Sequence, residues 1–342
     1  MRALLSAALL ATLAVLPAAV RAQEAPSPGG PPPASSAPPP ADDDLPQGGT
    51  LRVRTNLVNT YFSARDKGGY LTGLHKDDCK VYENKEEQAI KNFTQEKNLP
   101  LTIGILLDTS GSMERVLPLE KEAAADFLRD VIKSKDEAFL INFDINVELL
   151  SDYTNSTREL RRGLDKAEIN TGAGTGSVTG NSTPRGTLLY DAVYLATHDK
   201  LRQEAGRKVV VMLTDGDDQG SQVKLKEAIE AAQKANTIVY VILIRDTGGF
   251  GFGGGYNMSF GAGAMDQLTK ETGGRVINGG NGKHLDENFQ QISDELRTQY
   301  LLSYTPKNAN IDGTFRTINI TCGNDVKIQA RKGYYAIADN NP

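Results

Sequence analysis

One carboxylate and two hydroxyls occur on alternate residues directly after an apolar run. Asp108, Ser110 and Ser112 follow the apolar residues 101–107. Alternate positions on an extended loop can face one centre, and Gly111 lets the backbone bend closely there. All three donors are oxygen atoms, which suit a hard cation such as Mg²⁺, Mn²⁺ or Ca²⁺ and do not suit zinc. The segment therefore predicts ligands for a hard divalent cation.

Two other parts of the chain offer oxygen donors of the same kind. Asp215 and its neighbour Thr214 follow a second apolar run, residues 209–213. Thr187 supplies a third hydroxyl at the start of an expected helix, residues 187–203. Because stretches that leave the carboxyl ends of parallel strands build one crevice, we expect these donors to lie together. The candidate metal ligands are Asp108, Ser110, Ser112, Thr187 and Asp215.

The pattern between residues 99 and 299 predicts the sheet that positions these donors. Its nearly continuous apolar runs are typical of strands buried on both faces, as in parallel sheets. The runs alternate with segments whose apolar residues recur at helical spacing. This alternation predicts a doubly wound, mostly parallel, Rossmann-like α/β sheet.

Short β-like segments lie on both sides of the α/β unit, at residues 50–98 and 300–337. Because chain termini often lie near each other, we expect the two segments to pair into one small β-sandwich-like domain, with the α/β unit inserted between them. Cys79 lies in the first segment and Cys322 in the second. In an exported chain an even number of cysteines favours a disulfide, and two buried free thiols are the alternative.

The start of the chain carries a signal for export. A basic residue precedes a long apolar run, and a small-residue exit ends at Ala22, which predicts a secretory signal peptide over residues 1–22. An uncleaved membrane anchor is the alternative. No later run is long enough to span a bilayer. We therefore expect a mature chain without a membrane span, located in the periplasm or outside the cell.

Two terminal segments are expected to lie outside the folded part. Nine of the 15 prolines fall between residues 26 and 46, which predicts an extended, disordered linker over residues 23–49. Residues 338–342 are expected to form a tail.

The candidate ligands resemble a known site. Asp-x-Ser-x-Ser, then a threonine, then Thr-Asp-Gly, in this order at strand ends, resemble the metal-ion-dependent adhesion site of the von Willebrand factor A family. The resemblance implies that Ser110, Ser112 and Thr187 are hydroxyl ligands. It implies that Asp108 and Asp215 bind the ion directly or through water. The two flanking segments further resemble a secreted bacterial family of related proteins, known mainly from acidobacteria.

Charge counting predicts what such a site does. Two carboxylates offset the charge of a dication, and the other donors are neutral, so the ion stays electrophilic and can accept a Glu or Asp carboxylate from a protein partner. We therefore predict a secreted, non-enzymatic binding or adhesion module, with Mg²⁺ as the preferred ion. A metal-stabilised structural module of a cell-envelope assembly is the alternative. A haloacid dehalogenase-like phosphatase is a remote one, because it needs an aspartate where Ser110 stands.

The composition argues against other classes. The formal net charge is −5 and no basic run occurs, so nucleic acid is not an expected partner. Three histidines and two cysteines are too few for a zinc ribbon or a disulfide scaffold.

Overall fold

The computed structural model describes residues 57–96, 99–169, 186–244 and 258–337. These residues belong to one compact unit, Arg54–Pro342. The predicted signal peptide (1–22), linker (23–49) and tail (338–342) lie outside the described residues. No described helix is long and apolar enough to cross a membrane.

A six-stranded sheet forms the centre of the α/β part, with strand order β11-β10-β9-β6-β7-β8. Only the edge strand β8 runs antiparallel to its neighbour. Every residue of β6, β9 and β10 is buried, which explains their continuous apolar runs. The strands are β6 (Leu101–Asp108), β7 (Glu137–Phe143), β8 (Val147–Thr154), β9 (Arg207–Thr214), β10 (Thr237–Ile244) and β11 (Val276–Gly280).

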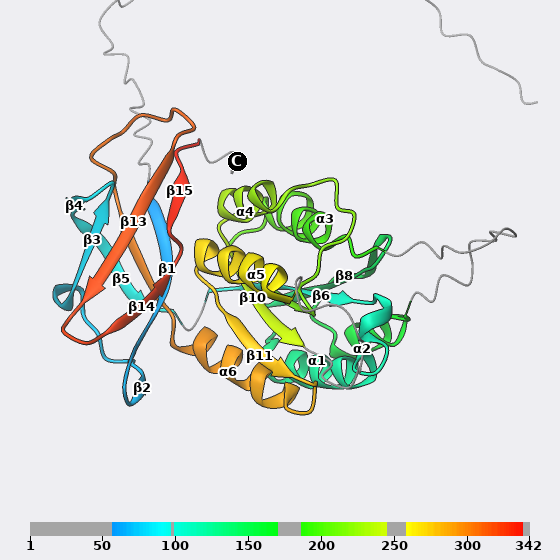
Figure 1. Cartoon of the computed structure of the whole chain (residues 1–342). Coiled ribbons are helices and arrows are strands. Elements are labelled where there is room, and N and C mark those ends of the chain that lie inside the picture. Colours follow the sequence, from blue (N-terminus) through cyan, green and yellow to red (C-terminus); the bar gives the residue numbers. More distant parts are fainter. Residues whose placement is uncertain (1–56, 97–98, 170–185, 245–257, 338–342) are drawn as a thin grey trace, which may run out of the picture. The chain divides into compact units, whose positions relative to one another are not determined.

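Helices cover both faces of this sheet. Figure 1 shows α3, α4 and α5 on one face and α1, α2 and α6 on the other, and two separate apolar cores lie beneath them. The doubly wound α/β fold predicted from the sequence is therefore confirmed. The helices are α1 (Leu117–Val131), α2 (Thr157–Asp165), α3 (Leu189–Tyr194), α4 (Leu225–Lys234), α5 (Met258–Thr272) and α6 (Leu285–Thr298), with a π-helix, η3 (Leu195–Leu201), after α3 and short 3-10 turns η1 (Lys76–Asp78) and η2 (Gly111–Met113).

The segments before and after the α/β part form two further sheets. One has the order β14-β1-β12-β5, with β2 paired to β1, and the other has the order β15-β13-β3-β4. Side chains from both sheets share one apolar core, as in a sandwich. The strands are β1 (Val58–Asp66), β2 (Gly69–Tyr70), β3 (Cys79–Glu83), β4 (Glu86–Gln88), β5 (Ile90–Gln95), β12 (Tyr300–Tyr304), β13 (Phe315–Cys322), β14 (Lys327–Ala330) and β15 (Gly333–Tyr335).

Strand pairing within the sandwich joins the two ends of the described chain. β13 alternates buried and exposed residues throughout, as expected of a strand with one face on a core. Cys79 of β3 lies directly opposite Cys322 of β13, and the two sulfurs form a disulfide. This covalent link closes a loop of 243 residues that contains the whole α/β part.

Candidate metal centre

Asp108 ends β6, the strand that pairs with both β7 and β9. This central position buries the side chain completely. Its Oδ1 accepts a hydrogen bond from the backbone N–H of Ser110 (3.0 Å), and its Oδ2 accepts one from the hydroxyl of Thr214 (2.6 Å). The carboxylate therefore joins the carboxyl ends of β6 and β9, as the order of strands requires.

The two serines meet in the turn after β6. Ser110 is the N-cap residue of the 3-10 turn η2, which brings its Oγ to within 3.0 Å of the Oγ of Ser112. Ser110 is buried, whereas Ser112 is exposed. The turn thus places one hydroxyl beside the buried carboxylate and the next one toward solvent.

The loop after β9 holds Asp215 in a fixed position. The hydroxyl of Thr214 accepts the backbone N–H of Gly216 (2.9 Å), and Oδ1 of Asp215 accepts that of Asp217 (3.1 Å). Gly216 has φ +85°, and a Cβ on Gly261 of α5 would lie 2.4 Å from the Gly216 carbonyl oxygen. Glycine is therefore required at both positions, because one has left-handed backbone and the other leaves no room for a side chain.

Thr187 lies in an extended segment at this edge, and not at the start of a helix as expected. It lies two residues before α3, and its backbone N–H and C=O both pair with Gln219, each at 2.9 Å. The next residue, Leu188, donates to the backbone oxygen of Asp144 (2.8 Å), whose carboxylate accepts the hydroxyl of Thr109 (3.0 Å). The expected helix start at residue 187 is wrong, because these pairings fix Thr187 in an extended bridge between the two loops.

Burial and a neighbouring negative charge both raise the pKa of Asp108. Burial, and then the negative charge of Asp215, raise the pKa of Asp108 from 3.8 to about 7, although hydrogen bonds from Ser110 and Thr214 act in the opposite direction. In the part of the chain that the structure describes, neither aspartate forms an ion pair with a basic side chain. Two carboxylates thus lie close together at one edge of the sheet without a compensating positive charge.

A third carboxyl group, which the sequence analysis missed, lies near the other two. Glu120 on α1 is 0% exposed, and neither of its oxygens has a hydrogen-bond partner among the described residues. Burial raises its pKa well above the usual value, and the charges of Asp108 and Asp215 raise it further. Position 120 lies three residues from the buried Leu117 and Ala123, so a glutamate on the buried stripe of the helix was the available signal.

The donor chemistry of this edge fits a hard dication that is held partly by hydroxyls. Among the described residues, no three His, Cys, Asp or Glu side chains are grouped so as to hold a metal. An ion here would therefore depend on Ser110, Ser112 and Thr187 as well as on the two aspartates. All of these donors are oxygen, the type that Mg²⁺ and Ca²⁺ prefer. A dication would also offset the buried negative charge, which is costly when uncompensated.

A comparison with protein families finds one family that matches the part of the chain containing this edge of the sheet. The model described as "von Willebrand factor type A domain" matches residues 102–257, a range that contains all five candidate ligands. Residues 102–257 are therefore similar to a von Willebrand factor type A domain. The matched range contains strands β6 to β10 of the six-stranded sheet, and β11 and the sandwich lie outside it.

Comparison with solved structures finds matches at low sequence identity. The conserved hypothetical protein BatB from Bacteroides thetaiotaomicron is 18% identical, covers 57% of this chain and 97% of its own, and gives a TM-score of 0.42. Proximal thread matrix protein 1 from the mussel byssus, with a zinc-occupied MIDAS motif, is 13% identical, with coverages of 60% and 50% and a TM-score of 0.45.

The vWF domain of the type V pili tip protein Mfa5 from Porphyromonas gingivalis is 11% identical, with coverages of 58% and 95% and a TM-score of 0.42. No curated protein matches the chain.

Proposed function

We propose that this chain is an exported, non-enzymatic binding module that captures a Glu or Asp carboxylate of a protein partner through a bound divalent cation. Mg²⁺ is the preferred ion, and Mn²⁺ or Ca²⁺ are substitutes. Its ligands are Asp108, Ser110, Ser112, Thr187 and Asp215, bound directly or through water. The observation that carries the proposal is the pair of unneutralised aspartates beside serine hydroxyls at one strand edge.

The charge balance of this donor set favours capture of an external acid. Asp108 and Asp215 together offset the two positive charges of the ion, and the hydroxyls add none. The ion therefore retains an attraction for a further anionic oxygen. Because the side chain of Ser112 is exposed, an external carboxylate can approach the ion from that side. A hydrolase of the haloacid dehalogenase type needs a second carboxylate two residues after the first, and Ser110 occupies that position.

Metal binding is tested by stability. With Mg²⁺ at 100 times its Kd, the free energy of unfolding should rise by about 2.7 kcal/mol. For a unit of this size the melting temperature should rise by about 5–10 °C. Asp108→Ala should abolish the increment, and Asp130→Ala, which removes an exposed aspartate from α1, should retain it. An equal response of the wild type and Asp108→Ala to Mg²⁺ would show that the assigned ligands are wrong.

Capture is tested by retention of envelope proteins on the immobilised chain. We expect a partner that is retained in Mg²⁺, released by EDTA, and not retained by Asp108→Ala in either buffer. Retention that is the same in Mg²⁺ and in EDTA would contradict capture and would indicate the structural alternative, a metal-stabilised module of an envelope assembly. Metal-dependent release of phosphate from a phosphomonoester would indicate an enzyme.

A further inference from the structure

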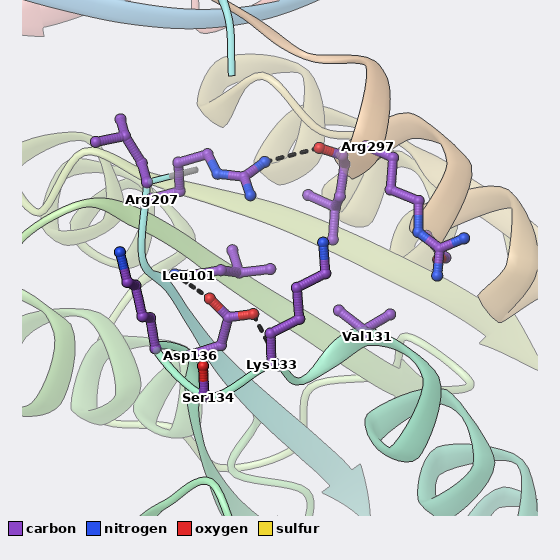
Figure 2. Close-up of a pocket in the computed structure, with 11 residues that line it drawn as sticks. Leu101, Val131, Lys133, Ser134, Asp136, Arg207 and Arg297 are labelled. Atoms are coloured by element: carbon purple, nitrogen blue, oxygen red, sulfur yellow. Dashed lines mark hydrogen bonds between the residues drawn. The ribbon is translucent and has the colours of Figure 1, made fainter. Parts of the chain in front are cut away.

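A pocket of about 210 Å³ lies at the edge of the sheet where β6 and β9 begin, opposite the edge that carries Asp108 and Asp215. We call it the amino-edge pocket. Its walls come from the starts of these two strands, the end of α1, the end of α6 and the loop between α1 and β7. Figure 2 shows the lining side chains arranged around this space.

Positive charge dominates the lining of the pocket. Four basic side chains and one carboxylate line it: Lys133, Lys135, Arg207, Arg297 and Asp136. Both oxygens of Asp136 accept backbone N–H groups, those of Leu101 and Lys133, each at 2.9 Å. Among the described residues none of the four cations forms an ion pair. The pocket therefore carries an excess of three positive charges in a chain whose net charge is negative.

Arg207 is the buried member of this group. Its residue is 8% exposed, and burial lowers its pKa. Its Nη1 donates to the backbone oxygen of Leu296 (2.7 Å), whereas its Nε has no partner among the described residues. The hydroxyl of Ser293, which also lines the pocket, is likewise buried without a described partner. Two donors beside the pocket are thus unsatisfied.

The buried Arg316 and the partly buried Arg275 are both compensated. Arg316 pairs with Glu83 at 3.4 Å, and Arg275 pairs with Glu295 at 3.0 Å. Arg207 has no carboxylate at that range among the described residues, although three more cations lie around the same pocket. The charges of Asp136 and Glu96 act on Arg207 from farther away. A buried cation is costly unless an anion accompanies it, and Asp136 is the single carboxylate among the four basic side chains that line the pocket.

We propose that the amino-edge pocket binds a small, doubly charged oxyanion of the phosphate type. Arginine and lysine are the side chains that recognise such anions, and a dianion offsets most of the excess charge. The volume is below the roughly 300–1,000 Å³ of pockets that hold drug-sized ligands, which favours a small anion. The anion is either free inorganic phosphate or the phosphate of a small monoester. The proposal uses none of the metal ligands, so it stands or falls independently of the proposed function.

The test is calorimetric titration of the full chain with inorganic phosphate, in EDTA and at constant ionic strength set with chloride. We expect saturable one-site binding. Lys133→Gln/Lys135→Gln, a change confined to exposed side chains, should weaken it by at least about tenfold. The matched control Lys67→Gln/Lys91→Gln removes the same charge from exposed sites on the sandwich and should leave the affinity unchanged.

Two outcomes would overturn the proposal. One is the absence of saturable binding at millimolar phosphate. The other is an equal loss of affinity in the pocket and control variants, which would show only general charge screening. Titration with glycerol 1-phosphate separates the two sources of the anion: tighter binding than inorganic phosphate supports a monoester, and weaker binding supports the free ion.

Discussion

Two glutamates of this molecule are completely buried and have opposite surroundings. Glu295 on α6 and Glu120 on α1 are both 0% exposed. Neither oxygen of Glu120 has a described hydrogen-bond partner. Glu295 instead accepts from five side chains: Ser63 at 3.3 Å, Tyr70 at 2.8 Å, Tyr240 at 2.8 Å, Arg275 at 3.0 Å and Gln329.

The donors to Glu295 explain its role. Some come from β1, β2 and β14 of the sandwich, and others from β10 and the residue preceding β11 of the α/β part. Glu295 therefore joins the two parts, and the protein itself supplies the compensation. Glu83 is similar, since it accepts from Tyr304, Tyr334 and Arg316. Near the end of β6, Glu120 has no described hydrogen-bond donor, and Asp108 has two neutral donors but no basic partner among the described residues. The two regions therefore differ in how the protein compensates a buried carboxyl group.

Removal of the compensated glutamate should have the largest effect. Glu295→Leu leaves the two tyrosine hydroxyls and the charge of Arg275 without their acceptor, so the free energy of unfolding should fall by about 3–5 kcal/mol. Denaturation by urea in the absence of metal measures this change in the free energy of unfolding. Glu287→Leu, an exposed site in the first turn of the same helix, is the control and should change stability far less. Equal effects of the two variants would show that the Glu295 contacts contribute little.

The pH dependence of stability is the next effect in size. The pKa of Asp108 is about 7 in the folded protein and 3.8 ordinarily, so the folded state holds a proton that the unfolded chain has lost between these values. The stabilisation that this proton contributes is complete below pH 4 and disappears as the pH rises to 7. The free energy of unfolding falls over this range by up to about 4 kcal/mol. The difference in unfolding free energy between the wild type and Asp108→Asn, measured in EDTA across this range, isolates it. A difference that does not vary with pH would contradict this account of Asp108.

The same comparison shows what the sequence could predict. Asp108 and Asp215 follow continuous apolar runs, and the edge of a parallel sheet is where such residues gather, so their strands could be located from local pattern. Thr187 could not be placed correctly, because its conformation depends on pairing with Gln219, which has no local signature. Glu120 gave a weak signal, since one acidic residue on an otherwise apolar stripe is visible, but its proximity to the aspartates depends on how α1 packs on the sheet.

Glu120→Leu should change stability in the opposite direction from Glu295→Leu. It removes a buried carboxyl group that has no described partner, so the metal-free protein should gain about 1–3 kcal/mol in the free energy of unfolding at pH 7. Glu122→Leu, an exposed position on the same helix, is the matched control. A loss of stability in Glu120→Leu comparable with that of Glu295→Leu would mean that Glu120 is a structural acid, and the contrast between the two regions would fail.

The smallest effect concerns the exposed hydroxyl of the site. Ser112→Ala removes one neutral oxygen donor and leaves Asp108 and its hydrogen bonds in place, so Mg²⁺ should bind about tenfold more weakly, a loss of about 1.4 kcal/mol. Metal-free stability should be nearly unchanged, because the side chain is exposed and its described contact is with Ser110. Calorimetric titration with Mg²⁺ measures the affinity, and Ser151→Ala is the control. An effect on metal-free stability without one on Mg²⁺ affinity would place Ser112 with the structural contacts, because a ligand hydroxyl matters only when the ion is bound.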